Sequence, residues 1–107
     1  MKENPYSQGR EEMKELLKQY NNFKSGRKFN FIEEESFQRL IDYFDENENL
    51  SSAMEAVNFA IDQFPYSSSF YIRKADILLA TQNYYEGLTM LEKAEVLDSI
   101  DINLYIL

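Results

Sequence analysis

The 107-residue chain is long enough for one small domain with a modest core, and its 44% apolar content is ordinary for a folded, helix-rich protein. It has no cysteine and no histidine, which excludes disulfides, thiolate metal sites, and the commonest general base and zinc ligand. Its net charge of −8 disfavours binding to the phosphates of nucleic acids.

The charge differs between two parts of the chain. Residues 1–30 hold seven basic and four acidic side chains, a net charge of +3, whereas residues 31–107 hold four and fifteen, a net charge of −11. A basic or neutral partner therefore suits residues 31–107, although acidic helix surfaces commonly do no more than face water. No apolar run approaches the ~20 residues of a membrane span, and the first five residues lack the apolar core of a secretion signal. We expect a cytoplasmic protein that binds neither a membrane nor nucleic acid.

We interpret residues 1–31 as a leader that contains one amphipathic helix and a linker. From about Arg10 to Phe23, apolar side chains recur at three- and four-residue steps, namely at Met13, Leu16, Leu17, Tyr20 and Phe23. Few favourable ion pairs can form along this helix, so its stability depends on docking the apolar stripe. Ser25-Gly26-Arg27-Lys28 then ends the helix, since glycine suits the left-handed residue that follows one.

Two helices are expected next, near residues 32–46 and 51–64. The run Glu33-Glu34-Glu35 places negative charge where a helix N-terminus favours it. Between the helices, residues 45–51 offer oxygen atoms at alternate positions, as a calcium-binding loop does. The sixth position of such a loop should be glycine and is Leu50, and the twelfth should be glutamate and is Ala56. The segment is therefore interpreted as a turn.

The second half of the chain is predicted to hold helices near residues 68–81 and 84–97, and a further helix from about residue 102. Ser67-Ser68-Ser69 follows Pro65 and offers side-chain oxygens that can cap the first of these helices. Asn83, with Glu86 three residues later, forms a capping pattern for the second.

These helices belong to a repeat with a period of 34 residues and no gap. Equivalent positions are Phe37 and Tyr71, Phe44 and Leu78, Ala53 and Gly87, Val57 and Leu91, and Ala60 and Ala94. The two units span Glu34 to Ser67 and Ser68 to Asp101, and Tyr105 continues the register into a partial third unit. Small residues in the second helix of each unit permit close helix approach, and large ones fill the space between neighbouring units.

The pattern resembles the tetratricopeptide repeat family, whose positions for large, small and proline residues match most of these. The second unit lacks the family's proline at Ser99, and Ile41 and Lys74 also depart from its pattern. The resemblance implies an all-α fold in which residues 32–107 form a right-handed α-α superhelix. Repeats 34–67 and 68–101 and the partial repeat 102–107 would follow the leader helix.

In this family the first helices of successive repeats line a concave groove that binds another protein or a peptide. The resemblance carries this role to ten positions: Glu35, Gln38, Asp42, Asp45, Glu46, Ser69, Ile72, Asp76, Leu79 and Ala80. Asp42 and Asp76 stand where relatives that clamp a C-terminal carboxylate have Asn or basic residues, which argues against such a clamp. A segment with basic side chains beside an apolar anchor fits this groove better, unless its acids are merely solvated.

Other functional classes receive little support from the sequence. The three glycines are isolated, so no phosphate-binding loop is present, and carboxylates spaced along acidic helices do not indicate a catalytic cleft. We therefore expect no enzymatic activity and no catalytic, cofactor-binding or metal-binding residues.

The apolar ending, residues 103–107, leaves two further questions open. It indicates either the N-terminal piece of a longer array or self-association through residues 102–107. The function expected is a protein-interaction scaffold, and the alternative is an assembly module that homo-oligomerises through this open end. The basic leader helix could also occupy the acidic groove as an internal ligand.

Overall fold

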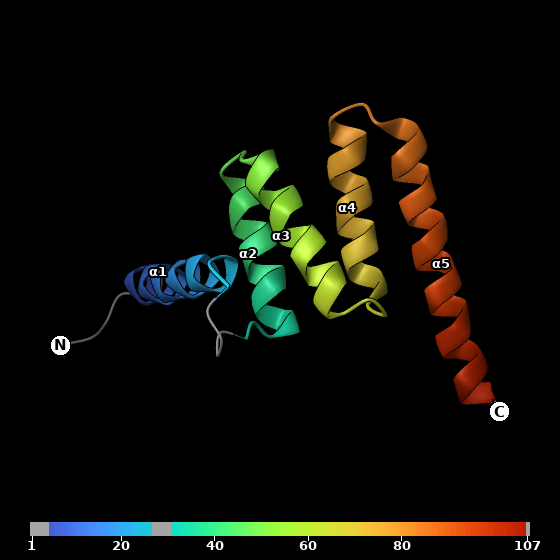
Figure 1. The fold of residues 1–107 in the computed structure, drawn as a ribbon, viewed down its shortest axis with the longest axis horizontal. Coiled ribbons are helices and arrows are strands. Elements are labelled where there is room, and N and C mark those ends of the chain that lie inside the picture. Colours follow the sequence, from blue (N-terminus) through green and yellow to red (C-terminus); the bar gives the residue numbers. More distant parts are fainter. Residues whose placement is uncertain (1–4, 27–30, 107) are drawn as a thin grey trace.

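The computed structural model describes residues 5–26 and 31–106, and over these residues it contains five α-helices and no strand (Figure 1). They are α1 (Pro5–Lys24), α2 (Glu34–Glu46), α3 (Leu50–Gln63), α4 (Ser68–Ala80) and α5 (Tyr84–Ile106). The all-α class predicted from the sequence is confirmed.

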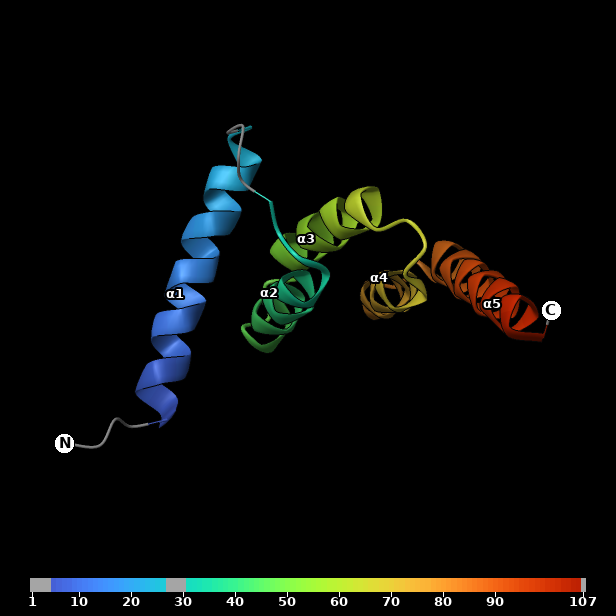
Figure 2. The same ribbon diagram turned by 90° about the horizontal axis from the view of Figure 1, so that it is seen from below.

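The helices are arranged as two antiparallel hairpins and one crossing helix. α2 pairs with α3 and α4 with α5, and contacts between α3 and α4 join the two hairpins. α1 crosses the first hairpin steeply and lies on the opposite side of it from α4 (Figure 2). The radius of gyration is 15.9 Å, above the ~13 Å of a compact chain of this length. Each hairpin therefore packs only against its neighbours, as in a stack.

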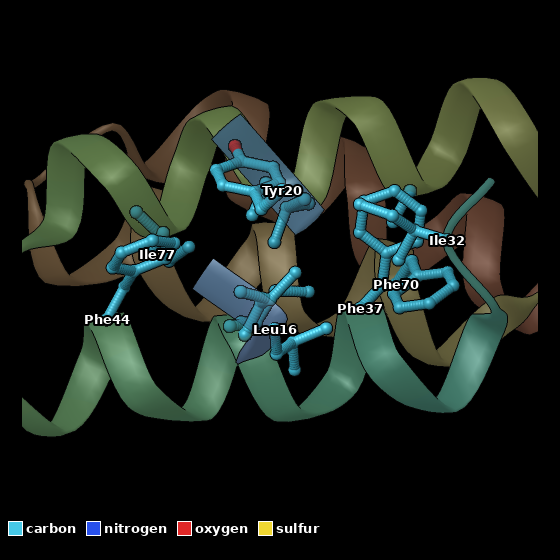
Figure 3. Packing of buried hydrophobic residues seen from close by; sticks show 13 residues of the cluster. Leu16, Tyr20, Ile32, Phe37, Phe44, Phe70 and Ile77 are labelled. Atoms are coloured by element: carbon cyan, nitrogen blue, oxygen red, sulfur yellow. The ribbon is translucent and has the colours of Figure 1, made fainter. Parts of the chain in front are cut away.

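Alanines let α2 and α3 approach closely. Ala53, Ala56 and Ala60 are fully buried along α3, and large side chains of α2 cover them. Phe37 extends the core beyond this hairpin, because its ring lies 6.2 Å from that of Phe64 and 6.3 Å from that of Phe70 on α4. Figure 3 shows Phe37 and Phe70 together at one end of the core and Phe44 at the other.

The same turn closes both hairpins. The backbone N–H of Asn49 donates to the carbonyl of Phe44, and the N–H of Asn83 donates to the carbonyl of Leu78, each over 2.8 Å. The residue before each asparagine is left-handed, with φ 56° at Glu48 and 66° at Gln82. This is the Schellman ending of a helix, and its two copies are 34 residues apart. The sequence repeat is thus reproduced in the backbone.

Gly87 shows why the second hairpin needs a small residue where the first has Ala53. A Cβ atom added at Gly87 would lie 2.9 Å from Cδ2 of Leu79 and 3.5 Å from the carbonyl oxygen of Ala75, both on α4. A larger side chain at this point would therefore require the Leu79 side chain to move.

The structure corrects two local predictions. α1 begins at Pro5 rather than near Arg10, since proline is well tolerated in the first turn of a helix. Ser67 precedes α4 without a side-chain capping bond, because its hydroxyl donates to Oε2 of Glu34 over 2.8 Å instead. The side-chain cap found is Asn49, whose oxygen accepts from the backbone N–H of Ser52 at the start of α3.

The separate helix predicted from about residue 102 is wrong, because α5 continues without interruption to Ile106. α3 ends at Gln63, two residues before Pro65, and a proline biases the preceding residue away from helical geometry. Ser99 occupies the equivalent position in α5 and has no such effect. Self-association was predicted through residues 102–107. The side chains of these residues lie outside those that the structure describes.

Candidate functional site

A depression lies between the first helices of the two hairpins, and we call it the α2–α4 groove. Its volume is about 240 Å³, and its lining residues are Ile41, Asp42, Asp45, Leu50, Arg73, Asp76, Ile77 and Ala80. Four of them, Asp42, Asp45, Asp76 and Ala80, were predicted from the sequence as groove residues.

Helical spacing explains why these side chains converge. Asp42 and Asp45 are one turn apart on α2, and Arg73, Asp76 and Ala80 follow one another at three- and four-residue steps on α4. Beneath them, Ile41 is 1% and Ile77 is 6% exposed. The groove therefore has an apolar floor and carboxylates on both walls.

One ion pair crosses the groove. Nη2 of Arg73 lies 2.6 Å from Oδ1 of Asp42, and the Arg73 side chain is 26% exposed. Asp45 and Asp76 are exposed and form no ion pair among the described side chains. The groove is lined by three aspartates and one arginine. Because the arginine neutralises only Asp42, the groove keeps a net negative charge.

Hydroxyl groups bridge α2 and α4 at the end of the groove where both helices begin. Nε2 of Gln38 donates to Oγ of Ser69 over 2.7 Å, and Oγ of Ser69 lies 3.1 Å from Oγ of Ser67. Ser67 in turn donates to Glu34. Gln38 and Ser69 were predicted to contact a partner, but they hydrogen-bond to each other and hold the two helices together.

The remaining predicted groove residues lie outside the depression. Leu79 faces α5, where its side chain contacts Gly87. Glu46 lines another depression, of about 510 Å³, between α1 and α2, and Asp42 also reaches it. Glu35 and Ile72 are exposed without lining either one.

The leader helix does not act as the internal ligand of the α2–α4 groove, since no described residue of α1 lines it. α1 packs instead on the opposite side of α2, through the apolar stripe that was predicted to dock. Leu16 and Tyr20 are buried there, and the ring of Phe23 lies 5.9 Å from that of Phe37 and 5.1 Å from that of Phe59.

A polar contact also fastens α1 to α3. The hydroxyl of Tyr20 donates to Oε1 of Glu55 over 2.8 Å, and Nζ of Lys24 lies 2.9 Å from the same oxygen. Burial raises the pKa of Tyr20 far above its ordinary value, and the hydrogen bond to Glu55 adds to this. Burial alone would raise the pKa of Glu55, but the hydrogen bonds from Lys24 and Tyr20 outweigh it and lower that pKa.

No family model, no curated protein and no solved structure matches this chain. The groove geometry and the internal repeat therefore carry the functional argument. None of the described helices has the length and apolar character needed to cross a bilayer. The described residues also contain no group of three or more side chains placed to hold a metal ion.

Sequence reasoning missed Arg73 and the floor residues Ile41, Leu50 and Ile77. Apolar floor residues look like ordinary core positions in a sequence, because their spacing is that of any buried helix face. Arg73 and Asp42 are 31 residues apart and meet only because two helices pack side by side. The sole sequence signal was that Arg73 is one of only four basic side chains after residue 30.

Proposed function

We propose that the chain is a protein-interaction module of the tetratricopeptide type. Its α2–α4 groove binds a segment of another protein that carries basic side chains beside apolar ones. The observation that carries the proposal is the combination of an apolar floor with carboxylates on both walls. Such a surface complements a cationic, partly apolar segment in charge and in hydrophobicity.

The repeat supports the tetratricopeptide assignment. The same backbone turn joins the two helices of each hairpin. The small residues at equivalent positions, Ala53 and Gly87, lie where the second helix packs on the first. The first helices of the hairpins face each other across the groove (Figure 2), as expected when hairpins stack in register.

The proposal is tested with short fluorescein-labelled peptides, one with two Arg residues flanking a pair of Leu residues and one with Glu in place of Arg. We expect the cationic peptide to bind and the anionic one not to, by fluorescence anisotropy. Asp45→Lys and Asp76→Lys should each weaken binding by roughly fivefold or more, because each reverses a charge on a groove wall. These two sites are preferable to Asp42, whose substitution would also release Arg73.

Asp62→Lys is the matched control, since it makes the same change of charge at an exposed position of α3 outside the groove. If Asp62→Lys weakens binding as much as the groove variants do, the effect is one of net charge and the groove is not the site. Absence of binding by the wild-type chain would also contradict the proposal.

A second candidate function, assembly through α5, is favoured by one observation. Apolar side chains remain exposed along this helix, with Leu88 58%, Val96 57% and Ile100 49% accessible. They follow one another at multiples of four residues and therefore form a stripe on one side of the helix. Exposed apolar surface of this kind marks contact sites, and here it would join two copies of the chain.

A further inference from the structure

We infer that the α2–α4 groove recognises an arginine side chain, and that Arg73 occupies this position until a partner's guanidinium replaces it. The inference rests on the proposed function of the groove and identifies the chemical group that the groove selects. It also assigns to Arg73 the role of an internal competitor.

Arg73 itself shows that the groove accepts a guanidinium. Its Nη2 atom is 2.6 Å from Oδ1 of Asp42, and most of the side chain is shielded from solvent. The volume of about 240 Å³ is below the range of pockets that enclose whole small-molecule ligands. It therefore suits a side chain that enters from a bound protein segment.

The floor favours arginine over lysine. A guanidinium is flat and weakly hydrated, so its faces can lie over the apolar surface of Ile41 and Ile77 at small cost. An ammonium group is compact and strongly hydrated, and it would lose part of its hydration there without a matching acceptor below. Carboxylates stand on both walls, which suits the several donors around a guanidinium edge.

Asp45 and Asp76 supply the acceptors that Arg73 leaves unused. Each follows one member of the ion pair by three residues on its own helix, so the two carboxylates are one turn further along the same groove. A partner's guanidinium can begin its contacts there and then displace Arg73 from Asp42. Removal of Arg73 should consequently strengthen binding.

The test uses the full chain and three labelled peptides that are identical except for Arg, Lys or citrulline at the two basic positions. Citrulline keeps the shape of arginine but has no charge. We expect the Arg peptide to bind about fivefold more tightly than the Lys peptide, and the citrulline peptide to bind most weakly. Arg73→Gln should raise the affinity for the Arg peptide about two- to fivefold, the range for removing one half-exposed ion pair.

Arg39→Gln is the control, because it removes the same charge from an exposed position on α2 that does not line the groove. Equal increases in the two variants would show a long-range charge effect and overturn the role of Arg73. Equal affinities for the Arg and Lys peptides, with Asp45→Lys still weakening both, would overturn arginine selectivity and leave the proposed function standing. If no cationic peptide binds to the wild-type chain, the proposed function itself fails. The comparison of peptides on the wild-type chain needs no substitution, so it decides selectivity even if a variant does not fold.

Discussion

Glu48 and Gln82 hold the least favourable backbone geometry in the described chain, apart from the glycines. Each lies in the left-handed region, which costs a residue with a side chain about 1 kcal/mol or more relative to glycine. Both are exposed. The left-handed residue is needed in each turn, because it directs the chain back along the preceding helix and so forms the hairpin. Nothing in the spacing of apolar residues indicated these positions, since the turn is defined by backbone bonds.

We expect Glu48→Gly and Gln82→Gly each to raise the free energy of unfolding by up to about 1 kcal/mol, because glycine adopts the left-handed conformation without strain. Urea denaturation followed by circular dichroism measures the change. Ser51→Gly is the control: it lies in the first turn of α3 and should destabilise, as glycine does within helices. A loss of stability in Glu48→Gly comparable to that in Ser51→Gly would show that the turn is not strained.

At the scale of elements, what the sequence predicted depended on where each helix finds its contacts. The spacing of Leu16 and Tyr20 predicted a docked leader helix, since a stripe of apolar residues requires a covering surface. The stripe could not reveal the partner surface, and so left open whether α1 would enter the groove. The docked position includes a contact with Glu55, 31 residues after Lys24, whose carboxylate accepts hydrogen bonds from both Tyr20 and Lys24. The full length of α5 was equally hidden, because Ser99 neither favours nor prevents a helix end as a proline would.

The attachment of α1 should weaken in acid. The pKa of Glu55 is lower in the folded chain than in the unfolded one, so its contribution to stability is complete above about pH 4.3, the usual value for glutamate, and is lost as the pH falls through the folded value. The carboxylate is 43% exposed, which limits the effect to about 1 kcal/mol. Hydrogen exchange of the amides of α1 between pH 3 and 6 measures it, after correction for intrinsic rates. Glu55→Gln should remove most of this acid dependence.

The control for this experiment is Glu95→Gln, which removes an exposed carboxylate from α5, a helix that has no significant packing against α1. If α1 loosens with the same acid dependence in wild type and in Glu55→Gln, the contact with Glu55 does not fasten it. The contribution of Tyr20 to stability depends on pH in the opposite direction. Its pKa is raised in the folded chain, so this contribution persists until the pH exceeds about 10 and is lost above that. Between about pH 4.3 and pH 10, the contact of Glu55 with Tyr20 and Lys24 should therefore contribute fully to stability.

For the whole molecule, the two candidate surfaces respond to salt in opposite directions. Binding of a cationic segment in the groove gains from attraction between unlike charges, and this attraction weakens as the Debye length shortens from about 30 Å at 0.01 M to about 10 Å at 0.1 M. Self-association through α5 brings together two chains of net charge −8, so salt reduces their repulsion and strengthens the association.

We expect the average mass in sedimentation to rise with protein concentration, and to rise further with salt. Val96→Lys should keep the chain monomeric with stability changed by less than about 0.5 kcal/mol, because Val96 is exposed. A wild-type mass that stays monomeric at every salt and protein concentration would rule out assembly through α5 and leave the groove as the functional surface. A mass that rises equally in Val96→Lys would place the contact elsewhere on the chain.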